Sequence, residues 1–307
     1  MDNVNDFFAT LSSCLWGWPM IILLLGTHIF LTIRLRFPQR KIITAIRLSV
    51  QRDKSQKGDV SQFGALATAL AATIGTGNII GVATAVALGG PGAVFWCWLT
   101  GVFGISTKYS EALLAIKYRV KSKRGTMQGG PMYTLERGLG WRKMGILFAL
   151  FTAIAAFGIG CTVQANAIST IMHASYGIST EVSGGVLMLL AAAVIIGGVR
   201  SISKVCSMLV PFMALLYVVG CIYILCVNAS YVAPALKLIV CSAFSPDAAG
   251  GGFAGASVIM AARYGIARGL FSNESGLGSA PIVAAAARTK NPVRQALFLQ
   301  PAHFGIQ

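Results

Sequence analysis

At residues 74–78 the chain reads IGTGN, and these five residues interrupt the hydrophobic segment Leu66–Leu88. A second hydrophobic segment, residues 251–287, is interrupted by the stretch GLFSNESG at residues 269–276. Irregular backbone persists at membrane depth only where protein or a water-filled cavity surrounds it, because lipid offers no hydrogen-bond partners. Two broken spans in one chain therefore predict a substrate and ion site of the kind found in secondary transporters.

The amino-acid composition also predicts a membrane protein. Hydrophobic residues make up 55% of the 307 residues and charged residues only 11%, which is too few for the surface of a soluble protein of this size. A helix needs about 20 apolar residues to cross a bilayer. We therefore expect an all-α, polytopic membrane helical bundle with seven spans: Leu15–Ile33, Leu66–Leu88, Ala93–Ile116, Met144–Met172, Val182–Val199, Met208–Val227 and residues 251–287.

The positive charges predict how these spans are oriented. The formal net charge is +16, and the lysines and arginines are concentrated in alternate loops. Eight lie between the first and second spans, eight between the third and fourth, two after the fifth and three after the last. Loops rich in Lys and Arg face the cytoplasm, so we expect a multi-pass protein with its N-terminus outside. A bacterial plasma or inner membrane, a lipid bilayer, accounts for the charge, and no nucleic-acid partner is needed.

The sequence lacks the residue patterns of catalytic sites. It contains no Ser/His/Asp order, no paired catalytic carboxylates and no Walker motif. Its seven cysteines form no C-x-x-C pair, so they predict neither a metal site nor a disulfide. An enzyme is therefore not expected. A channel, or a half-transporter that assembles as a dimer, is an alternative because either could contain the same broken helices.

The first break predicts groups that bind an anion and a cation. The backbone N–H groups of Thr76, Gly77 and Asn78 would begin a second half-helix, whose N-terminus carries about half a positive charge and suits a carboxylate. The carbonyl groups of residues 71–74 would end the first half-helix without amide partners and would suit a sodium ion. An alternative is that Gly77 and Gly81 only form a helix-packing face.

The second break supplies further candidate ligands and a charge. Phe271 can form an apolar wall, while Ser272 and Asn273 offer oxygen atoms. Gly276 permits a turn. Glu274 is ionisable at membrane depth, where a charge costs about 2.5 kcal/mol or more unless it is paired or hydrated.

Two of these polar residues are open to more than one interpretation. Glu274 can form a structural ion pair in a group with Arg268 and Glu111, or it can take part directly in ion or proton binding. Gln164 lies inside the span Met144–Met172, where it can contact substrate or form a hydrogen bond between helices.

Four longer motifs occur in order along the chain. They read AATIGTGNIIGVA at residues 71–83, GGPGAVFW at 89–96, GGPMY at 129–133 and RGLFSNESGLGSAP at 268–281. In this order they resemble the alanine or glycine:cation symporter family, and the resemblance extends from about residue 10 to Leu297. It implies a LeuT-type fold, with one extra N-terminal helix before two inverted repeats, and import of a small neutral amino acid with sodium. No cofactor is implied beyond sodium as the coupling ion.

The resemblance also implies which residues bind substrate and sodium. The backbone at Thr76 and Gly77 should hold the substrate carboxylate. The predicted substrate-binding residues are Thr76, Gly77, Gln164, Phe271 and Asn273. The predicted sodium ligands are the Thr73 carbonyl, Asn78 and Ser272 at one position and the carbonyls of Ala71 and Ile74 at another. The second position would be completed by a helix late in the second repeat.

The same resemblance predicts the domain organisation. Residues 1–297 would form a single transmembrane transporter domain, with the first repeat at about 60–228 and the start of the second at about 250–297. The stretch 298–307 is too short and too polar to supply the next span, so we expect an aberrant tail and an incomplete second repeat. Such a truncated or pseudogene product should be inactive by itself. Alternatives are an intended short protein and another cation-coupled small-solute transporter, and the choices of alanine or glycine and of sodium or proton stay open.

Overall fold

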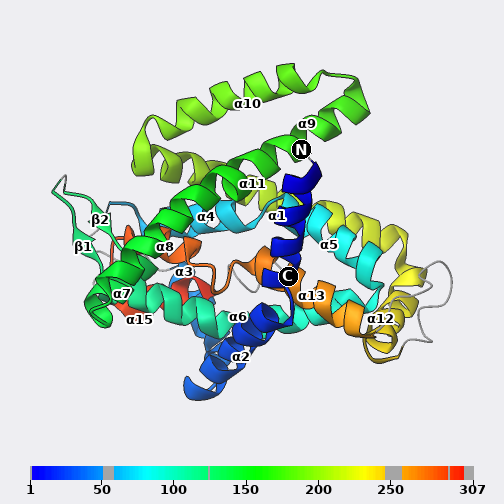
Figure 1. Ribbon diagram of the computed structural model, residues 1–307, viewed down its shortest axis with the longest axis horizontal. Helices are drawn as coiled ribbons and strands as arrows, with labels where there is room; N and C mark the ends of the chain where they lie inside the picture. Colours follow the sequence, from blue (N-terminus) through cyan, green and yellow to red (C-terminus); the bar gives the residue numbers. More distant parts are fainter. Residues whose placement is uncertain (1, 51–58, 124, 246–257, 290, 301–307) are drawn as a thin grey trace.

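The computed structural model describes residues 2–50, 59–123, 125–245, 258–289 and 291–300, which are mostly helical (Figure 1). Strands occur among them as a short antiparallel hairpin of β1 (Val120–Lys121) and β2 (Met127–Gln128). The prediction of an all-α membrane bundle is confirmed at this level. The LeuT-type arrangement and the repeats stay predictions.

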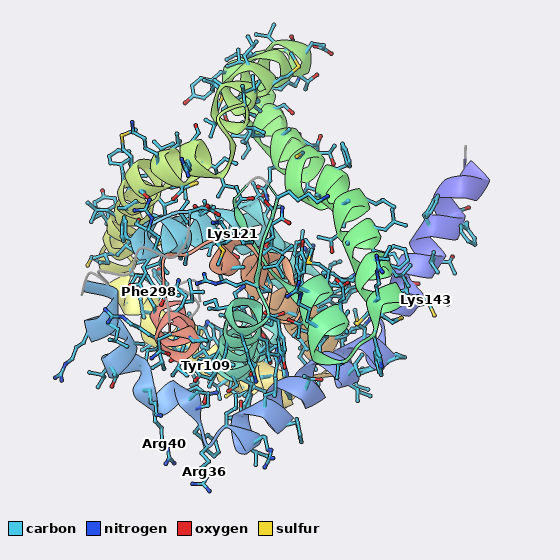
Figure 2. All side chains as sticks on the ribbon, turned by 90° about the vertical axis from the view of Figure 1, so that its left-hand side faces the viewer. Arg36, Arg40, Tyr109, Lys121, Lys143 and Phe298 are labelled. Carbon is cyan, nitrogen blue, oxygen red and sulfur yellow. The ribbon has the colours of Figure 1, made fainter. Side chains whose placement is uncertain are left out.

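The predicted first span, Leu15–Ile33, corresponds to the second helix of the N-terminal region, and a further helix precedes it. The elements of this region are α1 (Asp2–Leu15), α2 (Trp18–Arg34), the 3-10 helix η1 (Pro38–Lys41) and α3 (Ile42–Val50). Trp16 and Gly17 separate α1 from α2, and Pro19 lies in the first turn of α2, where a missing N–H is tolerated. Arg36 and Arg40 follow α2 and point away from the bundle (Figure 2).

The first broken segment forms two helices, as predicted, and two more follow it. The elements are α4 (Gln62–Thr73), α5 (Thr76–Gly89), α6 (Gly92–Lys117) and α7 (Pro131–Gly138). The Ser61 hydroxyl caps α4 by accepting a hydrogen bond from the Gly64 N–H at 2.9 Å. Pro131 begins α7, where its fixed φ suits the first turn of a helix.

The middle of the chain is a series of apolar helices. Its elements are α8 (Arg142–Ala155), the π-helix η2 (Ala156–Thr162), α9 (Val163–Tyr176), α10 (Thr180–Ile195), α11 (Gly198–Val227) and α12 (Ala229–Phe244). The first three form one continuous rod, and α9 and α10 extend together away from the other helices at the top of Figure 1. α12 was not among the predicted spans.

The second broken segment also forms two helices. The elements here are α13 (Val258–Asn273), α14 (Ser279–Ala285) and α15 (Pro292–Phe298). Asn291 begins α15 by accepting hydrogen bonds through Oδ1 from the N–H groups of Val293, at 2.9 Å, and Arg294, at 3.3 Å. Residues 251–257 of the predicted span lie outside the described residues.

α6 is the helix against which many of the others pack, including α2, α5, α12, α13, α14 and α15. α13 lies very close to it because two glycines face α6. A Cβ atom at Gly265 would lie 2.8 Å from the Cβ of Trp96, and one at Gly269 would collide with the Thr100 hydroxyl. Small residues four positions apart allow helices to approach closely in membranes. This contact places the second break directly beside α6.

Four stretches of the described chain are long and apolar enough to cross a membrane: Asp6–Arg34, Gln62–Gly89, Arg142–Tyr176 and Gly198–Val227. α10 and α12 are shorter apolar helices. α6, which coincides with the predicted span Ala93–Ile116, is less apolar because it carries Lys108 and Glu111. Large apolar side chains are exposed along α10 and α11, as lipid-facing helices require. The number of crossings stays a prediction.

The last described residues are buried. Phe298 is 1% exposed and packs in a hydrophobic cluster with Leu66, Ala112 and Ala284. Tyr109 of α6 packs against the same cluster, and both aromatic residues are labelled in Figure 2. Residues 298–300 begin the stretch that was predicted to be an aberrant tail, and residues 301–307 lie outside the described residues.

Candidate substrate and ion site at two helix breaks

The first break lies where the sequence predicted it. α4 ends at Thr73, and the next two residues have extended backbone, with φ −83° and ψ 98° at Ile74 and φ −152° and ψ −166° at Gly75. α5 begins at Thr76, and the Asn78 N–H donates to the Gly75 carbonyl at 3.1 Å. A helix end rich in carbonyl groups and a helix start rich in N–H groups therefore face one another across two residues.

The N-terminus of α5 binds the side chain of Gln164. The Thr76 N–H donates to Gln164 Oε1 at 3.3 Å, and the Thr76 hydroxyl donates to the same oxygen at 2.9 Å. The amide also lies over Gly75, where a Cβ atom would come within 3.2 Å of Gln164 Nε2. The structure therefore brings Gln164, Thr76 and Gly75 together, and it shows an oxygen acceptor at the place predicted for a carboxylate.

The π-helix η2 directs Gln164 toward this break. It covers Ala156–Thr162, includes Gly158 and Gly160, and ends two residues before Gln164. A π-helical turn contains more residues than an α-helical turn, so it rotates the side chains that follow, and such turns are frequent at functional sites. The sequence analysis did not predict η2, and the two glycines were the only local sign of it.

Three predicted sodium ligands lie together between the breaks. Asn78 Nδ2 donates to the Thr73 carbonyl at 2.9 Å, and the Ser272 hydroxyl donates to Asn78 Oδ1. Oxygen atoms of both broken segments thus converge on one amide, which is the donor chemistry that a hard cation prefers. The other two predicted ligands, Ala71 and Ile74, lie in the last turn of α4 and at its C-terminal cap. Carbonyl groups at such a helix end have no amide partners within the helix.

Phe271 covers the first turn of α5. It lies in the last turn of α13, and a Cβ atom at Gly77 would lie 3.8 Å from its Cε1 atom. The ring of Trp16, from the linker between α1 and α2, packs edge-on against Phe271 with ring centroids 6.2 Å apart. Thr76, Gly77, Gln164 and Phe271 therefore form one neighbourhood. The space above Gly77 would accept a single methyl group at an ordinary van der Waals distance from the ring, but little more.

The second break lies later in the chain than predicted. Residues 269–273 are helical, and the break runs from Glu274 to Gly278 before α14 begins. Glu274, Gly276 and Gly278 have positive φ values of 51°, 88° and 82°. The turn predicted at Gly276 is therefore present. Gly269, which was assigned to the break, instead provides the close contact with α6 described above.

Asn273 does not share the surroundings of the other predicted substrate residues. It is 1% exposed, and its side-chain oxygen and nitrogen have no hydrogen-bond partner within the described residues. Its carbonyl accepts a hydrogen bond from Lys108 Nζ at 2.9 Å. Asn273 therefore lies beside α6, whereas Phe271 and Ser272 face α5.

The predicted ion pair of Glu274 with Arg268 is absent from the described residues. The salt bridge found among them joins Arg142 to Glu136 instead, at 3.8 Å. Arg268 lies instead over Gly81 of α5, where a Cβ atom would come within 3.5 Å of its Nη1. The Glu274 carboxylate accepts a hydrogen bond from the Ser279 hydroxyl at 2.6 Å. The cation beside the break is Lys108, which the sequence analysis missed. A lysine inside the apolar stretch 93–116 was the signal that could have found it.

Comparisons with known proteins agree on one family. The family model described as "Sodium:alanine symporter family" matches residues 1–304. An uncharacterised transporter of Haemophilus influenzae is 52% identical over 297 residues, which cover 96% of this chain and 65% of that protein. The sodium/alanine symporter AgcS of Methanococcus maripaludis is 51% identical over 304 residues, which cover 97% of this chain and 66% of that protein. A probable sodium/glutamine symporter, GlnT, of Bacillus subtilis is 39% identical over 285 residues, which cover 92% of this chain and 59% of that protein.

The chain therefore spans between 59% and 66% of the length of these relatives, less than two thirds in each case. The family match continues to residue 304, so it gives no support to a tail that departs from the family after Leu297, nor to truncation or inactivity. The match covers almost the whole chain, and about half of the residues are identical to those of two relatives. This multi-pass membrane protein belongs to the sodium:alanine symporter family, a family of transporters and not of enzymes.

Proposed function

We propose that the two helix breaks form the binding site of a symporter that moves a small neutral amino acid, alanine or glycine, with sodium across the bacterial cytoplasmic membrane. The observation that carries this proposal is the meeting of Thr73, Asn78 and Ser272, which come from two broken segments far apart in sequence. Beside them, the Thr76 N–H and hydroxyl already bind an oxygen atom. An anion site and a cation site are therefore adjacent.

In this proposal the substrate replaces Gln164 at the first break. The substrate carboxylate accepts from the Thr76 N–H and hydroxyl, because a full negative charge suits a helix N-terminus better than a neutral amide oxygen does. The displaced Gln164 oxygen can then accept a hydrogen bond from the substrate ammonium group. Phe271 packs over the first turn of α5 and limits the size of the substrate side chain, which favours alanine and glycine.

Sodium binds at the carbonyl end of α4 in this proposal. Asn78 presents its Nδ2 donor to the Thr73 carbonyl, so cation binding there requires the amide to turn its oxygen toward the ion. Asn78 lies in the first turn of α5, two residues after Thr76, so the two proposed ligands would bind side by side. Any effect of one ligand on the affinity of the other is then reciprocal. Ala71 and Ile74 are proposed ligands of a second ion at the same helix end.

The family suggests the surrounding architecture, which we propose is a LeuT-type fold. The first repeat would occupy residues 60–228 and the second would begin near residue 250, with the N-terminal helices outside both repeats. The distribution of Lys and Arg supports an N-terminus outside the cell. A cysteine placed at Tyr176, in a variant without the native cysteines, should react with an impermeant reagent added outside intact cells. A cysteine placed at Lys123 should not, and the reverse result would contradict the orientation.

Equilibrium binding tests the proposed function without requiring transport. Purified protein should bind radiolabelled alanine in sodium chloride and not in choline chloride, and glycine should compete. Asn78→Leu should raise the sodium concentration for half-maximal binding about tenfold, because it removes one oxygen ligand. Asn166→Leu is the matched control, since Asn166 is an exposed asparagine on α9. Equal binding in choline would contradict sodium coupling. Competition by glutamine and not by glycine would favour the substrate named for GlnT.

A further inference from the structure

Two charged side chains of α6 bind the second helix break from one side. Lys108 and Glu111 are three residues apart, so they lie on the same face of α6. Lys108 Nζ donates to the carbonyl of Asn273 at 2.9 Å and to that of Glu274 at 3.4 Å. The Glu111 carboxylate accepts hydrogen bonds from the backbone N–H groups of Gly276 and Gly278, while its Oε2 atom is buried without a hydrogen-bond partner among the described residues. One residue therefore binds the end of α13, and the other binds the backbone that leads into α14.

The signs of the two charges match the backbone groups that they meet. The C-terminal end of a helix carries partial negative charge on its free carbonyl groups, and N–H groups that lead into a helix carry partial positive charge. The cation of Lys108 lies at the carbonyl end, and the carboxylate of Glu111 lies at the N–H end. An exchange of the two charges would place like charge against like at both ends.

Lys108 is buried, so its hydrogen bonds to the break are needed to offset the cost of removing its charge from water. Lys108 is 7% exposed in the middle of a helix that is otherwise largely apolar. A buried ammonium group is costly unless hydrogen bonds satisfy it. Its hydrogen bonds go to two backbone carbonyls of the break, and Glu111 bonds to backbone on the far side of the same turn. The two residues attract each other, yet the hydrogen bonds of each go to the break.

The break in turn sets the direction of the proposed ligands. Asn273 and Glu274, whose carbonyls bind Lys108, directly follow Ser272 and Phe271. Ser272 bonds to Asn78, and Phe271 lies over Gly77. On the other side, His28 of α2 is 1% exposed and bonds through Nδ1 to Thr107, beside Lys108, at 2.7 Å. α6 is thus fixed against α2 at the residue that precedes Lys108.

We propose that Lys108 and Glu111 are positioning residues that hold the second break open by charge, one at each end, and thereby fix Phe271 and Ser272 in the site. Their effect on ligand binding rests on the function proposed above, whereas their effect on the break does not. The two parts can therefore fail separately in one set of variants.

Amide hydrogen exchange tests the structural part in the full chain. Lys108→Met and Glu111→Gln should each speed exchange in a peptide covering residues 272–280 by about tenfold or more, because each removes charge-assisted hydrogen bonds to that backbone. Peptides of α10 and α11 should not change. Lys117→Met is the matched control, since Lys117 is exposed at the end of the same helix. Unchanged exchange at residues 272–280 in both variants would overturn the proposal, whatever happens to alanine binding.

A charge exchange separates this arrangement from a simple ion pair between Lys108 and Glu111. If the two residues chiefly stabilise each other, the double variant K108E/E111K should recover much of the protection from amide exchange, and of the protein yield, that either single variant loses. If they bind the break, amide hydrogen exchange at residues 272–280 should be at least as fast in the double variant as in either single variant. The amount of folded protein in the membrane should also be no higher. Lys108→Arg and Glu111→Asp keep the sign of each charge. Their yield of folded protein and their affinity for alanine should lie within about threefold of the wild type. Recovery by the charge exchange would overturn the proposal, even if the single variants fail to fold.

Discussion

The two helix breaks are held by different chemistry. At the first break, the neutral amides of Gln164 and Asn78 bind the free backbone groups. At the second, the charged groups of Lys108 and Glu111 do so. A neutral amide gives up its hydrogen bonds to a carboxylate or a cation at modest cost, because charged partners bind more strongly. A buried charged group cannot release its backbone partners at such a modest cost, because its charge would then be left without hydrogen bonds. For the proposed function, this comparison predicts that ligands bind at the first break and that the second break holds Phe271 and Ser272 in position.

The largest expected difference between the breaks comes from the same substitution made in each. Gly278 has φ +82°, and a Cβ atom there would lie 2.6 Å from Phe148 Cζ and 2.8 Å from Pro131 Cγ. Gly278→Ala should therefore destabilise the protein by about 3 kcal/mol, from the strained backbone and overpacking together. Gly75 is extended, and a Cβ atom there would meet the flexible end of Gln164 at 3.2 Å.

Gly75→Ala should consequently cost much less stability than Gly278→Ala. Thermal inactivation in detergent, followed as loss of monodisperse protein, measures both. Gly26→Ala is the control, because a Cβ atom there would meet nothing within 4 Å. Equal loss at Gly75 and Gly278 would show that the first break is as rigid as the second, against the comparison drawn here.

A smaller effect is expected from a permanent negative charge at the first break. Gln164→Glu would place a carboxylate against the Thr76 N–H and hydroxyl, which now bind the Gln164 amide oxygen. It would compete with the substrate carboxylate for the same donors, so we expect alanine affinity to fall about tenfold to a hundredfold. Asn166→Asp makes the same charge change at an exposed position two residues along α9 and should change affinity little. Unchanged alanine binding by Gln164→Glu would place the carboxylate elsewhere.

The sequence predicted the first break well because its signal is local. Glycines and small polar residues within an apolar segment mark residues 74–78, and no distant contact is needed to end α4 there. The same reasoning placed the start of the second break five residues too early and its end two residues too early. Gly269 lies within a continuous helix, and its lack of a side chain allows α6 to pack closely against it. Whether a glycine ends a helix or packs against another depends on the tertiary structure.

Three other features were not predicted because their local signals are weak. Lys108 lies within a predicted span, and only the arrangement of α6 and α13 shows that its charge has partners. η2 directs Gln164, yet the wider π-helical turn has no distinctive sequence beyond two glycines. α12 contains Pro234 and Lys237, which are typical of a loop, although the segment is helical. In α12 the packing against α6 outweighs the local preference of these residues.

The smallest expected effect is that of Gly77→Ala. A Cβ atom at Gly77 would lie 3.8 Å from Phe271 Cε1, an ordinary van der Waals distance, and alanine favours a helix more than glycine does. We expect alanine affinity within about threefold of the wild type. Gly77→Val adds two methyl groups in the direction of the Phe271 ring, where the substrate would lie, and should weaken binding about tenfold or more. Equal losses in both variants would mean that substrate touches the Gly77 backbone itself, so that the first break is no more adaptable than the second. Full binding by Gly77→Val would remove Gly77 from the site.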